Sequence, residues 1–261
     1  SVFIWLPLWM LISGTFMGGA ELSENLAPVL EGRGGTAVWP VMARYPTLAA
    51  YVELLLDTPQ FFTVFWNSCR QVFPIILGHV LLGAPAAWAF AKFHFRGKKI
   101  LYTLYIVLML MPFQVTMVSS YLVLNKLGLI DTVWAVILPG AASTLPVFIM
   151  TRFFMDIPEA AVDGASSFQT FLRFGLPLGA PGILSAVVLG FLEYWNAIEA
   201  PQAFLKNQAL WPLSLYMSNI TADNAGVSLI ASLITLMPPL LIFLSGQKYL
   251  EQGIISSGMK D

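Results

Sequence analysis

The segment EAAVDGASSFQTFLRFGLPL, Glu159 to Leu178, is a polar, alanine-rich interruption in a chain that is otherwise strongly apolar. It carries Glu159, Asp163 and Arg173, whereas the residues before and after it are mostly hydrophobic. Its small residues would let a partner surface approach the backbone closely, and Phe168, Phe171 and Leu172 would give a second helix an apolar face. We expect two short helices hinged at Gly164. They would form either an amphipathic interfacial helix or a docking helix for a cytoplasmic protein.

The composition of the whole chain is that of a membrane protein. Of its 261 residues, 57% are hydrophobic and 10% are charged, and the mean hydropathy is +0.76. Soluble proteins carry about 25% charged residues, so a bilayer is the expected solvent. The net charge of -1 gives no electrostatic case for nucleic acid. The lone Cys69 excludes an internal disulfide, and His79 and His94 lie in no ligand cluster, so we expect no metal site.

Six apolar runs divide the chain, and each is close to the roughly 20 residues needed to cross the hydrocarbon core. The first run is slightly short, and we interpret it as a helix whose beginning precedes Ser1. We therefore expect an all-α polytopic membrane protein with six transmembrane helices in a single domain, residues 1–261. The runs are Val2–Met17, Phe61–Ala91, Ile100–Leu124, Thr132–Phe154, Gly179–Leu205 and Val227–Tyr249.

Lysine and arginine are distributed unequally between the two sets of loops that these spans create. The richer set should be cytoplasmic, so both termini and residues 156–178 are expected inside and residues 18–60 outside. Within the outer segment, TLAAYVELLLD is a candidate amphipathic helix. The cytoplasmic set is Lys92, Arg96, Lys98, Lys99, Arg152, Arg173, Lys248 and Lys260, and the outer set is Arg33, Arg44, Lys126 and Lys206.

The third run contains MPFQV, in which Pro112 should bend the helix. Gln114 is costly against lipid and should face protein or water. It can make a helix–helix hydrogen bond or line a transport pathway, and the sequence favours neither.

The fifth run contains EYWNAIE, with two carboxylates inside the expected span. Glu193 and Asn196 share a helix face that Glu199 would extend, and intramembrane polar groups often line a pathway. The ring of Trp195 could stack on a sugar. The alternative places Trp195 and Glu199 at the outer interface, where water reaches them.

Several motifs together resemble one family. EAA, then Gly164, then nine residues and Phe174-Gly175-Leu176-Pro177 resemble the EAA loop in membrane subunits of binding-protein-dependent ABC importers. Further matches narrow the resemblance to the maltose/glycerol-3-phosphate-type carbohydrate permeases, from about Tyr45 to the end. These are FRGKK, MPFQV, NKLGLIDT (Asn125–Thr132), RFFMDIP (Arg152–Pro158) and WN (Trp195-Asn196).

This resemblance implies a type I importer permease fold in a bacterial cytoplasmic membrane. The chain would pair with a second permease subunit, and the pair would work with two ATPase subunits and an extracytoplasmic solute-binding protein. Together they would import a carbohydrate or a related polar solute. The chain has no phosphate-binding loop, so ATP and Mg would be held by the ATPase subunits and the chain would be no enzyme. The alternative is a secondary transporter working without an ATPase, for which Glu193 is nearly the only coupling carboxylate.

The resemblance also implies roles for named residues. Residues 156–178, called the coupling segment below, would contact the ATPase, and polar residues within the spans would line the pathway. The ATPase-coupling residues are Glu159, Ala160, Ala161, Asp163, Gly164, Ala165 and Phe168, and the pathway residues are Gln114, Glu193, Trp195 and Asn196.

The coupling segment departs from the family pattern, which has three residues between EAA and Gly. Here only Val162 and Asp163 intervene, and Ile157-Pro158 directly precedes Glu159. Either the loop has a true deletion, or a few residues are absent from the sequence. We favour the second, which predicts two neighbouring Cα atoms between Asp156 and Asp163 more than 3.80 Å apart.

Overall fold

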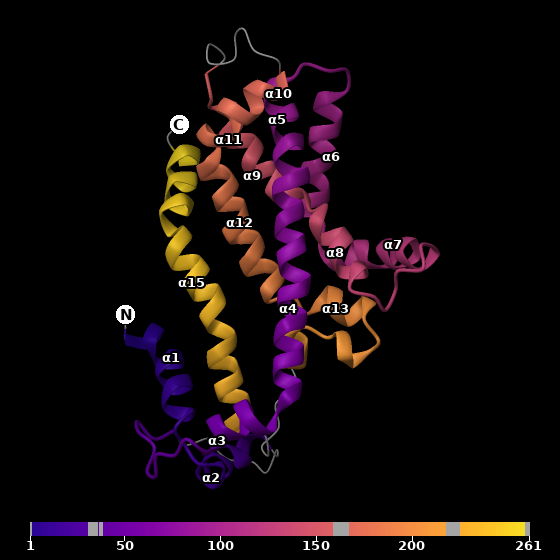
Figure 1. Ribbon diagram of the computed structural model, residues 1–261. Helices are drawn as coiled ribbons and strands as arrows, with labels where there is room; N and C mark the ends of the chain where they lie inside the picture. Colours follow the sequence, from indigo (N-terminus) through magenta and orange to yellow (C-terminus); the bar gives the residue numbers. More distant parts are fainter. Residues whose placement is uncertain (1, 31–35, 37–38, 159–166, 218–224, 259–261) are drawn as a thin grey trace. The chain divides into compact units, whose positions relative to one another are not determined.

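The computed structural model describes residues 2–30, 36, 39–158, 167–217 and 225–258, and within these ranges it contains helices and no strand (Figure 1). The chain divides into two compact units, which are described separately.

Unit 1 comprises residues 1–68 and 211–238. Its core is formed where the start of α4 and the short helices around it meet the first part of α15, and it contains Leu54, Phe61 and Ile230, each at most 3% exposed. The expected amphipathic helix is present as α3 and η1. The elements of unit 1 are α1 (Val2–Gly14), α2 (Gly19–Leu30), α3 (Ala49–Val52), η1 (Glu53–Asp57), α14 (Leu213–Tyr216), and the first parts of α4 (Pro59–Gly78) and α15 (Ala225–Gly258).

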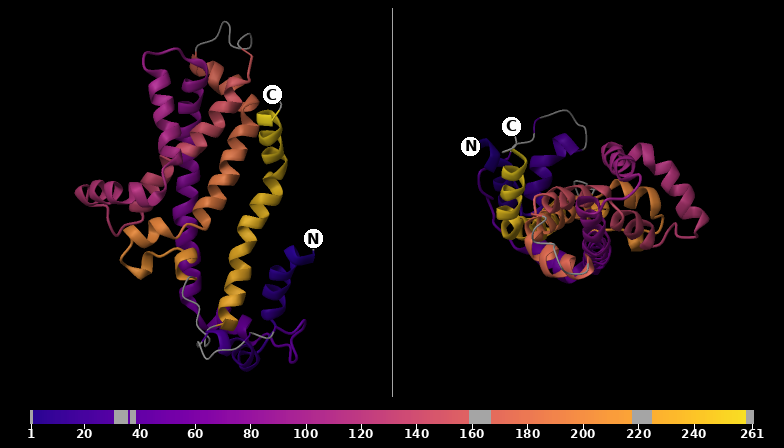
Figure 2. Two further views of the ribbon diagram at one scale, coloured as in Figure 1. Left: turned by 180° about the vertical axis from the view of Figure 1, so that it is seen from behind. Right: turned by 90° about the horizontal axis from the view of Figure 1, so that it is seen from above.

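Unit 2 comprises residues 69–210 and 239–261. In it, α9 lies between α5 and α12 and contacts both along its length (Figures 1 and 2). Besides the remainders of α4 and α15, its elements are η2 (His79–Gly83), α5 (Ala84–Lys92), α6 (Lys98–Leu110), α7 (Phe113–Lys126), α8 (Trp134–Ala141), α9 (Thr144–Met155), α10 (Ser167–Thr170), η4 (Phe171–Gly175), α11 (Leu176–Leu178), α12 (Ala180–Trp195), α13 (Glu199–Phe204) and η5 (Gln208–Leu210).

The apolar runs form helices, but not six uninterrupted spans. Among the described residues, Pro59–Lys92, Trp134–Met155 and Ala225–Glu251 are long and apolar enough to cross a bilayer, and two bent helix pairs raise the number to at most five. The first run gives only a shorter apolar helix, Ile4–Gly14. The expected count of six is therefore not confirmed by helix length.

The third run is broken where Pro112 stands. Helices α6 and α7 meet there at 107°, so α7 runs across the direction of α6 (Figures 1 and 2). Pro112 itself is extended, with φ −65° and ψ 148°, and it precedes the first residue of α7. The predicted bend is confirmed, and it is large enough to end one helix and begin another.

The fifth run also divides, and this corrects the expected span Gly179–Leu205. Helix α12 ends at Trp195, and Glu199 begins the separate helix α13. The Asn196 side chain explains the stop, because its Nδ2 donates a hydrogen bond to the carbonyl of Leu192, 2.8 Å away. That bond occupies a carbonyl in the last turn, where helices leave such groups unpaired. Glu193, Asn196 and Glu199 thus do not share one continuous helix face.

Candidate functional site

The central residues of the coupling segment lie outside the described part of the chain, and its two flanks lie within it. The expected coupling residues are therefore without a structural description; they are Glu159, Ala160, Ala161, Asp163, Gly164 and Ala165. The predicted gap between neighbouring Cα atoms before Asp163 stays a prediction for the same reason. Phe168 is described: it lies on α10 with 69% of its surface exposed. Its ring is open to a partner.

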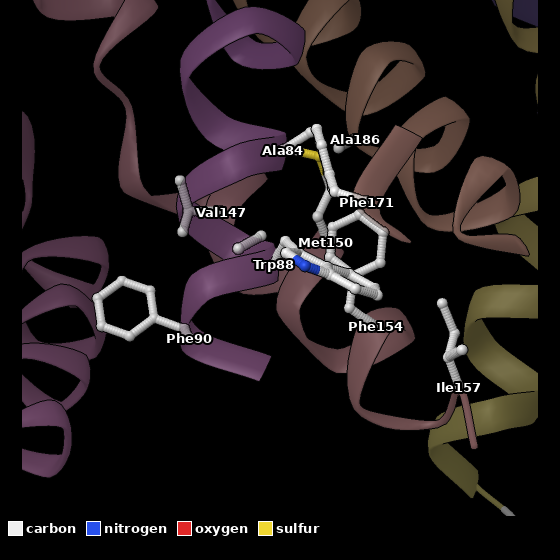
Figure 3. Close-up of a cluster of buried hydrophobic side chains, with 10 residues drawn as sticks. Ala84, Trp88, Phe90, Val147, Met150, Phe154, Ile157, Phe171 and Ala186 are labelled. Carbon is white, nitrogen blue, oxygen red and sulfur yellow. The ribbon is translucent and has the colours of Figure 1, made fainter. Parts of the chain in front are cut away.

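Downstream of Phe168, the coupling segment enters the core of unit 2 through Phe171. This side chain is 8% exposed and lies among buried residues of α5, α9 and α12 (Figure 3). Its ring centroid is 5.8 Å from that of Trp88 and 6.4 Å from that of Phe154. Trp88 and Phe154 meet edge to face, 5.3 Å apart. Aromatic contacts of this kind add about 0.5–1.5 kcal/mol each beyond the area that they bury.

Gly175, within the coupling segment, and Gly179, directly after it, allow the backbone to lie directly against these rings. A Cβ on Gly175 would lie 3.0 Å from Cζ3 of Trp88, and one on Gly179 would lie 2.1 Å from Cε1 of Phe154. Atoms this close must move apart, so the contact requires glycine at position 179. The end of the coupling segment is therefore joined to α5 and α9 by backbone-to-ring contact.

The upstream flank is fixed as well. Ile157 is 7% exposed and belongs to the same core as Phe171. The ammonium group of Lys92, the last residue of α5, donates a hydrogen bond to the Ile157 carbonyl. Both flanks of the coupling segment are thus attached to α5, so a force on the segment would reach that helix.

A polar contact joins α7 to α13. Gln114 Nε2 donates to Glu199 Oε1 across 2.7 Å. Beside this contact, the rings of Phe113 and Phe204 meet edge to face at 5.9 Å. Both expectations for Gln114 remain compatible with this geometry, because the bond joins two helices and its atoms are exposed.

The three other expected pathway residues differ in exposure. Glu193 and Asn196 are exposed on unit 2, at the end of α12. Trp195 is only 2% exposed and stacks on Phe191, with ring centroids 5.3 Å apart and planes at 15°. Its ring face therefore packs within the protein and is not open to a sugar in this structure. In the sequence, Phe191 was the available sign that Trp195 is buried and its neighbours are not, because Phe191 lies four residues earlier on the same helix face.

The sequence analysis gave His79 no role, yet it lies at a crossing of three helices. The side chain is 1% exposed, and its Nε2 is 2.9 Å from the carbonyl oxygen of Gly140. A Cβ on Gly190 would lie 2.7 Å from His79 Nδ1. The helical glycines at 140 and 190 were the available signal, because glycine within a helix often marks close packing.

Asp131 was likewise missed. Its Oδ1 accepts hydrogen bonds from the backbone N–H groups of Lys206 and Asn207, at 2.8 and 2.7 Å. Its own N–H donates to the carbonyl of Phe204 at 2.9 Å, and its φ is +61°. Asp131 therefore fastens the α7–α8 connection to the loop after α13. Asp and Asn are the side chains that adopt this backbone conformation most readily after Gly.

Comparison with known proteins gives a family match, similarity to two relatives and a match to a solved structure. A family model described as "Binding-protein-dependent transport system inner membrane component" matches residues 79–256. The chain is 24% identical to the arabinooligosaccharides transport system permease protein AraQ of Halalkalibacterium halodurans, over 97% of this chain and 90% of the relative. It is 28% identical to the diacetylchitobiose uptake system permease protein NgcG of Streptomyces coelicolor, over 74% and 68%.

The third finding is structural. A chain in the crystal structure of a bacterial ABC transporter involved in the import of the acidic polysaccharide alginate matches with a TM-score of 0.76, at 18% identity. The match covers 95% of this chain and 92% of the other. The two chains therefore share a fold.

Proposed function

Because the chain belongs to the family of binding-protein-dependent transport system inner membrane components, we propose that it is one of two permease subunits in an ATP-driven importer of a carbohydrate. The resemblance seen in its motifs is confirmed by this family match. The match covers residues 79–256, which include the core around Phe171, the coupling segment and the polar group at α12. That coverage is the observation that carries the proposal, and it gives no support to a secondary transporter.

An oligosaccharide is the proposed solute. Relatives along most of the chain are named for arabinooligosaccharide and diacetylchitobiose uptake. Gln114, Glu193 and Asn196 would line the pathway, because their exposed amides and carboxylates can hydrogen-bond sugar hydroxyls. Trp195 would support this group through its stack on Phe191.

The coupling segment would receive the motion of the ATPase subunits, which would hold ATP and Mg. The contact would be formed by Glu159, Ala160, Ala161, Asp163, Gly164, Ala165 and Phe168. The burial of Phe171 against Trp88 and Phe154 supports this role, because a segment anchored in the core moves the helices that hold it. Transmission through such packed contacts requires an element with two arrangements, and the α5–α9 pair is our candidate.

The proposed orientation follows the lysine and arginine distribution. Both termini and the coupling segment would be cytoplasmic. Residues 18–60 and the stretch Lys206–Gly226 would lie outside, where the solute-binding protein docks. The cytoplasmic membrane would be crossed six times if the first run, the pair α6 and α7, and α12 each count as one span beside the three long helices.

Co-purification tests this proposal. The chain, expressed with the genes around it, should bring down an ATPase and a second permease, and vesicles containing the complex should take up an oligosaccharide only with ATP and the binding protein. A chain that purifies alone and transports a solute down an ion gradient would show the proposal wrong.

A further inference from the structure

The connection between α5 and α6, Phe93–Gly97, is a tight turn with a defined conformation. Gly97 has φ +84°, which favours glycine, and the N–H of Lys98 donates to the carbonyl of Phe95 at 3.3 Å. The Lys98 ammonium group donates to the carbonyl of Phe93 at 3.0 Å. These bonds define the backbone path of the turn.

The turn exposes aromatic rings and cationic groups together. Phe93 and Phe95 are 41% and 40% exposed, and Arg96 and Lys99 are exposed beside them. Phe95 also packs against the core residue Phe90, with ring centroids 6.1 Å apart. Large rings exposed to water are unfavourable, so this pattern suits a surface that is apolar on one side and anionic on the other.

The position of the turn matches such a surface. It directly follows the candidate span Pro59–Lys92 and directly precedes the apolar helix Lys98–Leu110. The apolar part of the second helix begins at Ile100, directly after the turn, which favours a place for the turn near the lipid headgroups. Aromatic residues are enriched at that depth, and basic residues there are attracted by anionic lipid.

The charges of the turn are unbalanced. Residues 92–100 contain four lysines and arginines and no acidic residue. The amines of Lys92 and Lys98 are already bonded to the carbonyls of Ile157 and Phe93. Arg96 and Lys99 form no ion pair with any residue in the described part of the chain, so their charges are available to a ligand.

We propose that the turn Phe93–Gly97, together with Lys99 at the start of α6, binds the headgroup of an anionic phospholipid. Arg96 and Lys99 contact its phosphate, and the rings of Phe93 and Phe95 enter the acyl boundary. The rings distinguish a lipid from a free phosphate, which would give them nothing to contact. Because Lys92 at the edge of the turn holds Ile157, a bound lipid also steadies the start of the coupling segment. Only the assignment to the cytoplasmic leaflet rests on the proposed function.

The test uses the full chain, purified in neutral detergent and titrated with dioleoyl phosphatidylglycerol or dioleoyl phosphatidylcholine, with bound lipid counted by native mass spectrometry. The wild type should prefer phosphatidylglycerol. Arg96→Gln/Lys99→Gln should weaken that binding by about fivefold for each charge removed. The matched control Arg44→Gln/Lys126→Gln removes two exposed charges elsewhere and should keep the preference.

Two measurements guard against a variant that merely misfolds. Raising the salt concentration should weaken phosphatidylglycerol binding to the wild type itself, because exposed charges are screened. Phe93→Ser should also weaken it, with the charges intact. The proposal is overturned if Arg96→Gln/Lys99→Gln keeps the preference, if the matched control loses it equally, or if soluble glycerol phosphate competes as well as the lipid does.

Discussion

Replacing Gly179 by alanine probes the junction between the coupling segment and α9. The added Cβ would lie 2.1 Å from Cε1 and 2.7 Å from Cδ1 of Phe154, and 2.8 Å from the carbonyl oxygen of Gly175. Phe154 is 0% exposed and Gly175 is backbone, so neither can move freely. Gly179 has φ −84° and ψ 0°, which alanine also adopts, so the expected effect comes from packing alone.

Overpacking of this kind costs about 1–3 kcal/mol. For a chain of this size, that corresponds to a fall in Tm of about 2–12 °C. Cys69 is the only cysteine in the sequence, so a thiol-reactive dye can follow thermal unfolding of the purified chain. Because Phe154 must shift against Trp88 and Phe171, uptake driven by ATP should fall as well.

Two further variants sharpen this prediction. Gly226→Ala is the matched control, because its Cβ would meet Ala50 and Leu22 at 3.4 and 3.5 Å, which are ordinary contacts. Phe154→Leu should destabilise the Gly179→Ala protein less than it destabilises the wild type, because the shorter side chain relieves the clash. Wild-type melting and uptake in Gly179→Ala would refute the close approach described here.

Three other predictions concern the pathway, the hydrogen bonds of Asp131 and the coupling segment. Gln114→Leu should lower ATP-dependent uptake several-fold while shifting Tm by less than about 2 °C, because the bond to Glu199 is exposed; unchanged uptake would remove Gln114 from the pathway. Asp131→Ala should speed hydrogen exchange at the amides of Lys206 and Asn207 by about tenfold, because both amides lose their acceptor. Asp131→Asn should not, because asparagine keeps an acceptor and tolerates φ +61°. Equal exchange in both variants would contradict these hydrogen bonds. Gly164→Pro should abolish uptake without preventing membrane insertion, because proline would break the docking helix that the sequence predicts there. Normal uptake would exclude a docking helix at this position.

The sequence predicted the features that depend on local composition. Apolar runs marked the helices, Pro112 marked the bend between α6 and α7, and the amphipathic stretch before Asp57 forms α3 and η1. These features follow from residues near one another in the chain, so hydropathy and proline rules were sufficient.

The features that the sequence could not predict depend on contacts between distant residues. Gln114 and Glu199 are 85 positions apart, and neither motif indicates that the two side chains meet. Phe171 is buried and its neighbour Leu172 is 46% exposed, although both belong to the apolar face expected for the second helix. Helix α12 ends before Asn196, whose side chain donates a hydrogen bond to the backbone. The hydrophobic periodicity of the sequence does not detect such a bond.

The central claim is that the coupling segment drives the helices through Phe171. Its most direct test is the amount of oligosaccharide taken up per ATP hydrolysed by the reconstituted importer, compared between Phe171→Ala and Leu172→Ala. Phe171→Ala should lower this ratio at least severalfold, because it removes the side chain packed against Trp88 and Phe154. Leu172→Ala should leave it near the wild-type value. An unchanged ratio in Phe171→Ala, or an equal loss in both variants, would contradict the account.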